Sequence, residues 1–438
     1  MTAARDLSLE TLQLEQDGRV LTARFSNPPL NFMTTVFIRE LDQLTRSVDR
    51  DPTLGAVVLT GSVEGRFLTH LDAQELAGIA DLPHPKLPMQ AAEVVVLVLN
   101  VVLRLPGVAS LLERFGGAPG KGIVMGHRWK RLTLRMNRSA AVYLAAINGP
   151  VLDGGLEIVL ACDLRYAADA AHLRMAQMEM LVALIPGGGG SQRLLRMLGP
   201  ARVLEHVFEG VPLTAQEALE HGLVHRVVPE KRLLTEAQAT AARLARRSPT
   251  AVAALKRCLY FGTDRRFSRA LDLETAGFLA AGSTKAAGGV LKPFIEDLER
   301  LGDKPFLADP GPWIEGTRFD QVTQPTDMDR PIGQSRLSAA ATYLVYQDEG
   351  IGDSQPQNMP GTEWKSKTLK SFAWGLWRQD LPVTNCRLAN GQRLGIEEVR
   401  IGRSLPQMLI TLLTLGFVAP TRVSWRCCRP PSQSGTLV

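Results

Sequence analysis

Residues 147–193 constrain this chain most, because they place two glutamates in apolar surroundings beside glycine turns. Glu157 follows Gly154 and Gly155 at the start of an apolar run, and Glu179 precedes an Ile-Pro-Gly-Gly-Gly-Gly segment. A buried carboxylate is costly unless it is paired, hydrogen-bonded or protonated. Two such groups beside glycine turns therefore indicate acid/base chemistry.

The pattern around this segment predicts an α/β fold. Val20–Phe25, residues 56–60, Val142–Ile147 and residues 164–168 are apolar runs of strand length. A predicted helix separates the first two runs, because apolar residues recur at helical spacing at Phe37, Leu41, Leu44 and Val48. Short connections between strands and helices favour helices packed on a sheet.

Beyond residue 233 strand signals stop, and Ala-rich helical patterns continue to about residue 301. We expect Leu255, Leu259, Leu271 and Phe294 to be buried there. After residue 311 the character changes, because Gly, Pro, Ser and Gln become frequent and regular periodicity weakens.

Charge and cysteine usage narrow the function classes. Residues 331–438 hold 12 Lys or Arg against 7 Asp or Glu, which leaves 38 against 37 in residues 1–330. A nearly neutral main body argues against nucleic-acid binding. The five cysteines include no C-x-x-C pair, and the first ten residues have no apolar signal core, so we expect a cytoplasmic protein.

Two apolar runs, residues 94–103 and 408–419, fall short of the roughly 20 residues that a membrane-spanning helix needs. We expect no membrane span, and a buried or interfacial helix at each run. The histidines show neither zinc-type spacing nor an H-E-x-x-H pattern, so no metal site is expected. Gly187–Gly190 lacks a following Lys-Ser/Thr and is interpreted as a tight loop into a helix near Ser191.

Gly154 opens a helix whose first N–H groups have no intrahelical partner, and such an end can bind an oxyanion. Glu157 lies one turn further and can face the same cavity. The alternative is that Glu157 only complements the helix dipole and reaches solvent. Leu71, in the loop after the strand at residues 56–60, can present a second N–H donor.

Together these residues resemble the crotonase superfamily, the enoyl-CoA hydratase/isomerase group. The similarity rests on Asn148-Gly149, Gly154-Gly155-Leu-Glu157, Cys162-Asp163, Gln177-Met-Glu179 and Ile185-Pro186-Gly187, and it extends over about residues 10–305. It implies a spiral of repeated β-β-α units in residues 1–232, with an insertion at about 80–140. A helical C-terminal region at 233–315 and a non-family, poorly ordered extension at 316–438 complete the expected organisation.

The resemblance also implies roles for individual residues. Gly154 and Leu71 would form the oxyanion hole for a thioester carbonyl, and Glu157 and Glu179 would be the acid/base pair. The expected substrate-binding residues are Leu71, Asp72, Ala73, Gln74 and Gly154. The substrate would be an acyl-coenzyme A thioester in lipid metabolism, with no separate cofactor, and the protein would be a homotrimer or hexamer.

Four departures from the family pattern stand out. Asp153 occupies the position of a third glycine and adds a Cβ and a negative charge. His70 replaces a glycine just before Leu71, which matters if that backbone needs a positive φ. The separation of Glu157 and Glu179 is longer by two residues, and the insertion lies where the acyl pocket is usually lined.

Three functions remain open at this point. Two glutamates favour hydration of a 2-enoyl-CoA. A double-bond isomerase or another crotonase-type acyl-CoA enzyme would use one glutamate alone. A catalytically silent acyl-CoA-binding protein would result if Asp153 and His70 have disabled the oxyanion hole.

Overall fold

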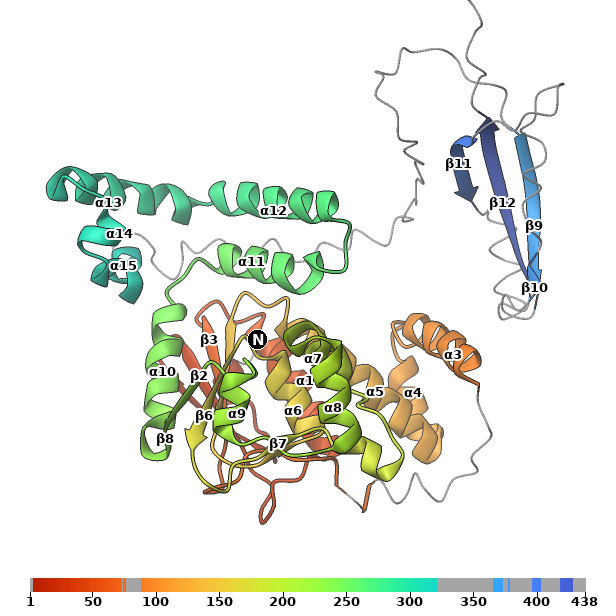
Figure 1. Cartoon of the computed structure of the whole chain (residues 1–438), viewed down its shortest axis with the longest axis horizontal. Coiled ribbons are helices and arrows are strands. Elements are labelled where there is room, and N and C mark those ends of the chain that lie inside the picture. Colours follow the sequence, from red (N-terminus) through yellow and green to blue (C-terminus); the bar gives the residue numbers. More distant parts are fainter. Residues whose placement is uncertain are drawn as a thin grey trace, which may run out of the picture. The chain divides into compact units, whose positions relative to one another are not determined.

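The computed structural model describes residues 3–72, 74–75 and 88–320, and the backbone of four strands between residues 365 and 427 (Figure 1). Contacts within the chain divide it into two units, Met1–Ser335 and Arg336–Val438. Ala73, expected in the substrate site, lies outside the described residues. So do residues 408–417 of the second apolar run.

A six-stranded sheet forms the centre of the first unit. Its spatial order is β1 (Leu12–Asp17), β2 (Val20–Phe25), β3 (Ala56–Gly61), β4 (Val142–Ile147), β6 (Leu164–Asp169) and β8 (Arg226–Pro229). β1 and β2 form an antiparallel hairpin, and every later pair is parallel. Parallel neighbours need crossover connections, and the chain winds through them in sequence order.

Helices and short segments connect these strands. In the main body they are η1 (Ala4–Asp6), α1 (Thr35–Val48), α3 (Met89–Val102), α4 (Val108–Phe115), α5 (Gly117–Met136), α6 (Gly154–Ala161), η2 (Glu179–Val182), α7 (Gly190–Leu198), α8 (Pro200–Glu209), α9 (Ala215–Glu220) and η3 (Glu230–Arg232). A second, two-stranded sheet pairs β5 (Val151–Leu152) with β7 (Met175–Ala176) in parallel. β5 immediately precedes α6, so this small sheet fixes where the helix begins.

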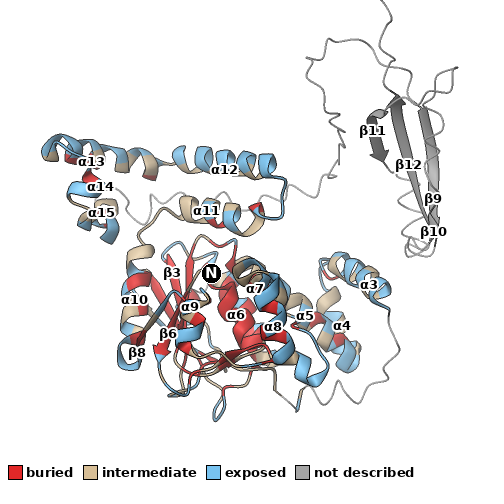
Figure 2. Ribbon diagram, viewed as in Figure 1, coloured by how far each residue is buried: buried red, intermediate tan, exposed pale blue. Residues whose placement is uncertain are grey.

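The core lies where strands and helix α6 meet. All residues of β3, β4 and α6 are buried, and Figure 2 shows α6 almost wholly in the buried colour. A strand that is buried on both faces has a continuous apolar sequence, so such strands are easily predicted from sequence. The predicted strands at β2, β3, β4 and β6 and the helix starting at Gly154 are confirmed.

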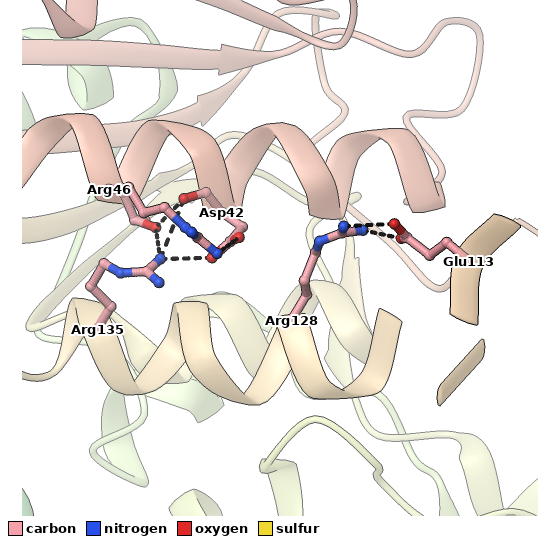
Figure 3. Close-up of polar contacts among 6 residues, drawn as sticks. Asp42, Arg46, Glu113, Arg128 and Arg135 are labelled. Carbon is pink, nitrogen blue, oxygen red and sulfur yellow. Dashed lines mark hydrogen bonds and ion pairs between the residues drawn. The ribbon is translucent and has the colours of Figure 1, made fainter. Parts of the chain in front are cut away.

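Ion pairs connect α5 to α1 and to α4 (Figure 3). On α1, the buried carboxylate of Asp42 accepts from Arg46 at 2.6 Å and from Arg135 of α5 at 2.8 Å. Arg128 of α5 pairs with Glu113 of α4, with a second nitrogen–oxygen distance of 2.9 Å. A buried carboxylate with two guanidinium partners fixes the orientation of α5 on α1.

The C-terminal part of the unit is helical, as predicted: α10 (Leu233–Leu244), α11 (Pro249–Gly262), α12 (Phe267–Gly282), α13 (Lys285–Leu301), α14 (Pro305–Ala308), α15 (Gly311–Glu315) and α16 (Thr317–Asp320). The predicted burial of Leu255, Leu259 and Leu271 is wrong, because these side chains are 60%, 62% and 45% exposed. No described part of the chain covers them. Phe294 is half-buried, with its ring 5.1 Å from Phe306 and 5.8 Å from Trp313.

Residues 94–102 form most of helix α3, as predicted, but no residue of α3 is buried. The buried alternative is therefore wrong for these residues, whereas Leu103, which follows the helix, is 4% exposed. Within the described residues, no helix has the length and apolar character needed to cross a membrane.

The second unit contains a four-stranded antiparallel sheet. Its order is β10 (Trp377–Arg378), β9 (Lys365–Phe372), β12 (Val418–Cys427) and β11 (Ile396–Gly402). Val418 and Ala419, the end of the second apolar run, belong to β12 and are extended rather than helical. The predicted domain boundaries, and the predicted poor order of residues 316–438, stay predictions.

Candidate functional site

Glu157 is held inside the protein by the glycine loop that precedes α7. Glu157 is only 4% exposed. Its Oε1 atom accepts hydrogen bonds from the N–H groups of Gly188 at 2.7 Å and Gly190 at 2.9 Å. Burial raises the pKa of Glu157, and the two N–H groups oppose that rise. The alternative in which Glu157 reaches solvent is therefore wrong.

Gly188 lies between Glu157 and a side chain that the sequence did not indicate, Trp129 of α5. The Trp129 Nε1 donates to the Gly188 carbonyl at 3.1 Å, and a Cβ at Gly188 would overlap both Nε1 and Glu157 Oε2. Arg193 donates to the same carbonyl at 3.1 Å. Trp129 lies 59 positions before Gly188 in the sequence, so no local pattern indicated its place beside Glu157.

The structure brings the segments of Gly154 and Leu71 together. Leu71 forms a parallel bridge with Met33, in which Met33 N donates to His70 O at 3.1 Å and Asp72 N donates to Met33 O at 2.8 Å. The N–H of Leu71 points away from that bridge, as the parallel pattern requires. The side chain of Met33 in turn reaches Gly154, since a Cβ there would overlap its methyl group.

The backbone of α6 also lies close to the backbone of the loop before Leu71. A Cβ at Gly155 would overlap the carbonyl group of Leu68, so only glycine allows this contact. Within the described residues, no acceptor is recorded for the N–H of either Gly154 or Leu71. Both donors are thus free to bind an oxygen atom of another molecule.

His70 adopts no positive φ; in the described chain Asn31, Asp153 and Ala183 are the non-glycine residues that do. The replacement of glycine at this position therefore causes no backbone strain. The ring of His70 lies 4.8 Å from the Phe32 ring, and its Nδ1 donates to the Leu71 carbonyl at 2.8 Å. His70 thus supports the loop that carries Leu71.

Asp153 does adopt a backbone conformation that favours glycine, with φ of 49° and ψ of −119°. Such strain costs about 1–3 kcal/mol and persists only where the surroundings hold it. Here the carbonyl accepts from Gln177 Nε2 at 3.0 Å, and the Oδ1 atom accepts from Met178 N at 2.6 Å. These contacts fix the Asp153 carboxyl group beside the residue that precedes Glu179.

Glu179 begins η2 and shares a cluster with Asp153 and Glu157. Burial, followed by the charges of Asp153 and Glu157 and a hydrogen bond with Asp153, raises the pKa of Glu179 to about 8. Its Oε2 atom is enclosed and has no donor among the described residues. An enclosed carboxyl group beside two other carboxyl groups favours its protonated form.

Asp72 and Gln74 continue the loop after Leu71, and the Asp72 Oδ1 atom accepts from Gln74 N at 2.8 Å. A cavity of about 400 Å³ adjoins this loop and the segment before Glu179. Its lining includes His70, Arg66, Arg174 and Met178. A second cavity of about 400 Å³, lined by apolar residues of α11–α13 and the helices that follow, contains none of the site residues.

In the part of the chain that the structure describes, no group of three His, Cys, Asp or Glu side chains could hold a metal ion. The site described above offers carboxyl groups and free backbone N–H donors. Glu157, Glu179, Gly154 and Leu71 lie on segments in mutual contact. Which roles they take is a separate question.

A family model described as "Enoyl-CoA hydratase/isomerase" matches residues 109–300. A probable enoyl-CoA hydratase of Rhizobium meliloti is 32% identical over 55% of this chain and 77% of its own length. A short-chain-enoyl-CoA hydratase of Clostridium acetobutylicum is 27% identical over 68% of this chain and 99% of its own length.

Among solved structures, an enoyl-CoA hydratase from Bacillus anthracis is 25% identical, with a TM-score of 0.53 over 66% of this chain and 97% of that chain. The fold and sequence similarities cover the same main body. The chain belongs to the enoyl-CoA hydratase/isomerase family, within the crotonase superfamily.

Proposed function

We propose that this chain hydrates 2-enoyl-CoA thioesters. The observation that carries the proposal is a pair of carboxyl groups in different environments beside the first turn of α6. Glu157 accepts two backbone N–H groups, which suits a carboxylate, whereas Glu179 has a pKa of about 8 and holds a proton near neutral pH. An ionised base and a protonated acid are what addition of water requires.

In this mechanism Glu157 takes a proton from water while the water oxygen bonds to C3 of the enoyl group. The π electrons of the C2–C3 bond move toward the thioester, and negative charge forms on its carbonyl oxygen. The N–H groups of Gly154 and Leu71 stabilise that charge, as oxyanion-hole donors do. Glu179 then delivers its proton to C2, and proton exchange with solvent restores both carboxyl groups.

Asp153 places negative charge next to the proposed oxyanion hole, where it would oppose the developing enolate. One contact reduces this effect, because the Asp153 carboxyl group accepts from Met178 N at 2.6 Å. The cavity beside the loop adds Arg66 and Arg174, whose positive charges suit the phosphate groups of coenzyme A. No separate cofactor enters this mechanism.

Substitution of each glutamate tests the proposal. We expect Glu157→Gln and Glu179→Gln each to lower turnover of crotonyl-CoA or a longer enoyl-CoA by about 10²–10⁴-fold. Glu220→Gln, at an exposed helix end, is the matched control and should keep full activity. Unchanged turnover in either active-site variant would remove that glutamate from the mechanism.

A second candidate is isomerisation of a 3-enoyl-CoA to the 2-enoyl form. It is favoured by the position of Glu157, whose Oε1 atom is occupied by the glycine loop, which leaves Glu179 to move a proton alone. In that case 3-enoyl-CoA should be consumed as rapidly in Glu157→Gln as in the unaltered protein. If Glu157→Gln loses both the hydration of 2-enoyl-CoA and the isomerisation of 3-enoyl-CoA, hydration by the two glutamates is favoured.

We also propose self-association, through the apolar surface of α11–α13. Phe267, Phe278 and Leu279 are 78%, 77% and 64% exposed, and apolar exposure on this scale marks an interface. The family resemblance implies a trimer or hexamer, which light scattering of the purified protein would measure. The cytoplasmic location and the role in lipid metabolism stay predictions.

A further inference from the structure

Helix α3 exposes apolar side chains around most of its circumference. Val95, Val96, Leu97 and Val98 are 45%, 52%, 65% and 46% exposed. Successive helical residues are 100° apart, so these four positions span roughly 300°. A helix with this pattern is not stable against water unless something encloses it.

Helix α3 has no buried residue, and its sequence is apolar except for Gln90, Glu93 and Asn100. At 14 residues the helix is about 21 Å long, which is shorter than the ~30 Å hydrocarbon core of a bilayer. An arrangement within the interface of a bilayer fits this length.

Helix α4, which follows α3 in the sequence, also exposes apolar side chains. Leu111 and Phe115 are 63% and 73% exposed, and Arg114 lies between them in the sequence. Residues 89–136 contain seven Lys or Arg against two Asp or Glu. Arg128 pairs with Glu113, and Arg135 pairs with Asp42 of α1, so five other Lys or Arg stand against one other acid, Glu93.

We propose that α3 and the exposed apolar residues of α4 dock on the surface of an anionic lipid bilayer. The apolar side chains enter the headgroup region, and exposed cations at Arg104, Arg114, Lys121 and Lys130 bind the lipid phosphates. A second copy of this chain fits less well, because a symmetric contact would bring two positively charged segments together. The surface would place the enzyme where long acyl chains partition.

Vesicle flotation of the full-length protein tests this proposal. The probes are vesicles of phosphatidylcholine alone and vesicles in which about a third of the lipid is phosphatidylglycerol. We expect binding to the anionic vesicles, weaker binding to the neutral ones, and a decline as salt rises. Absence of binding by the unaltered protein to either vesicle would overturn the proposal without any variant.

Two variants locate the contact. The double variant Leu97→Glu with Val101→Glu should lower the partition coefficient by more than about tenfold. Leu204→Glu, at a leucine 51% exposed on α8, is its control and should bind normally. Arg104→Glu with Lys121→Glu should weaken binding to anionic vesicles by at least about fivefold per residue, whereas Lys231→Glu in η3 should not.

The same variants identify the competing occupant. If Leu97→Glu with Val101→Glu reduces the oligomer size measured by light scattering, and vesicle binding is absent, α3 is an interface between protein chains and the lipid proposal is wrong. Equal loss of vesicle binding in the double variant and in Leu204→Glu would also contradict it.

Discussion

The negative charge of Asp153 beside Glu179 leads to a specific prediction about pH. Asp153→Asn removes the negative charge but keeps the size of the side chain, and asparagine tolerates the positive φ of 49° at this position. The change therefore separates the charge of Asp153 from the strain of its backbone. Its effect should appear in the protonation of Glu179.

The size of the effect follows from the contributions to the pKa of Glu179. A pKa of about 8, against an ordinary value of 4.5, leaves about ten protonated molecules for each ionised one at pH 7. Burial is the largest cause and persists in Asp153→Asn. Removal of the neighbouring charge should therefore lower the pKa only part of the way, by about one unit.

The assay is the pH dependence of the hydration turnover number. Because Glu179 must be protonated, activity of the unaltered protein should fall as the pH rises through about 8. In Asp153→Asn this basic limb should move to lower pH by about one unit, with similar activity near pH 6. Asp169→Asn, at an exposed carboxylate ending β6, is the charge-matched control.

Stability provides a readout that does not depend on catalysis. Because folding raises the pKa of Glu179, the protonated form contributes stability that is fully present below about pH 4.5 and is lost as the pH rises through about 8. Glu179→Gln cannot ionise, so the slope of melting temperature against pH should flatten between these values. An unchanged basic limb in Asp153→Asn, together with an unchanged slope in Glu179→Gln, would refute the reasoning.

Two further substitutions test the packing around the site. Gly188→Ala should displace Glu157 or Trp129, destabilise the protein by about 1–3 kcal/mol in chemical denaturation and reduce turnover, whereas Gly122→Ala, which has open space at its Cβ, should do neither. Asp42→Ala leaves the largely buried Arg135 without its carboxylate and should lower the free energy of unfolding by about 2–3 kcal/mol. The exposed pair Arg269–Asp272 provides the control, since Asp272→Ala should change the free energy of unfolding by less than about 1 kcal/mol.

The sequence predicted the buried parts of the fold best. β3 and β4 are continuous apolar runs because both faces of each strand are covered. The glycine pair Gly154-Gly155 indicated the start of α6, where Gly155 approaches the Leu68 backbone closely. Helical periodicity also predicted α11 and α12, but not the exposure of Leu255 and Leu259. Periodicity identifies an apolar face without indicating what covers it.

The candidate site was only partly accessible from sequence. Glu157, Glu179, Gly154 and Leu71 follow from motif positions, and their roles remain proposals. The contact of Trp129 with Gly188 joins residues 59 positions apart, which no local pattern reveals. The sequence position of Asp153 indicated an added charge, but the effect of that charge on Glu179 became apparent only from the fold of β5 and β7.

Hydration is the central claim, and transfer of solvent oxygen tests it most directly. The unaltered protein is incubated with a 2-enoyl-CoA in water enriched in heavy oxygen, and the product is analysed by mass spectrometry. The proposed mechanism predicts a 3-hydroxyacyl-CoA that carries one solvent oxygen, with formation slowed by about 10²-fold or more in Glu157→Gln. Consumption of 3-enoyl-CoA without incorporation of solvent oxygen, or tight acyl-CoA binding with no product from either substrate, would contradict it.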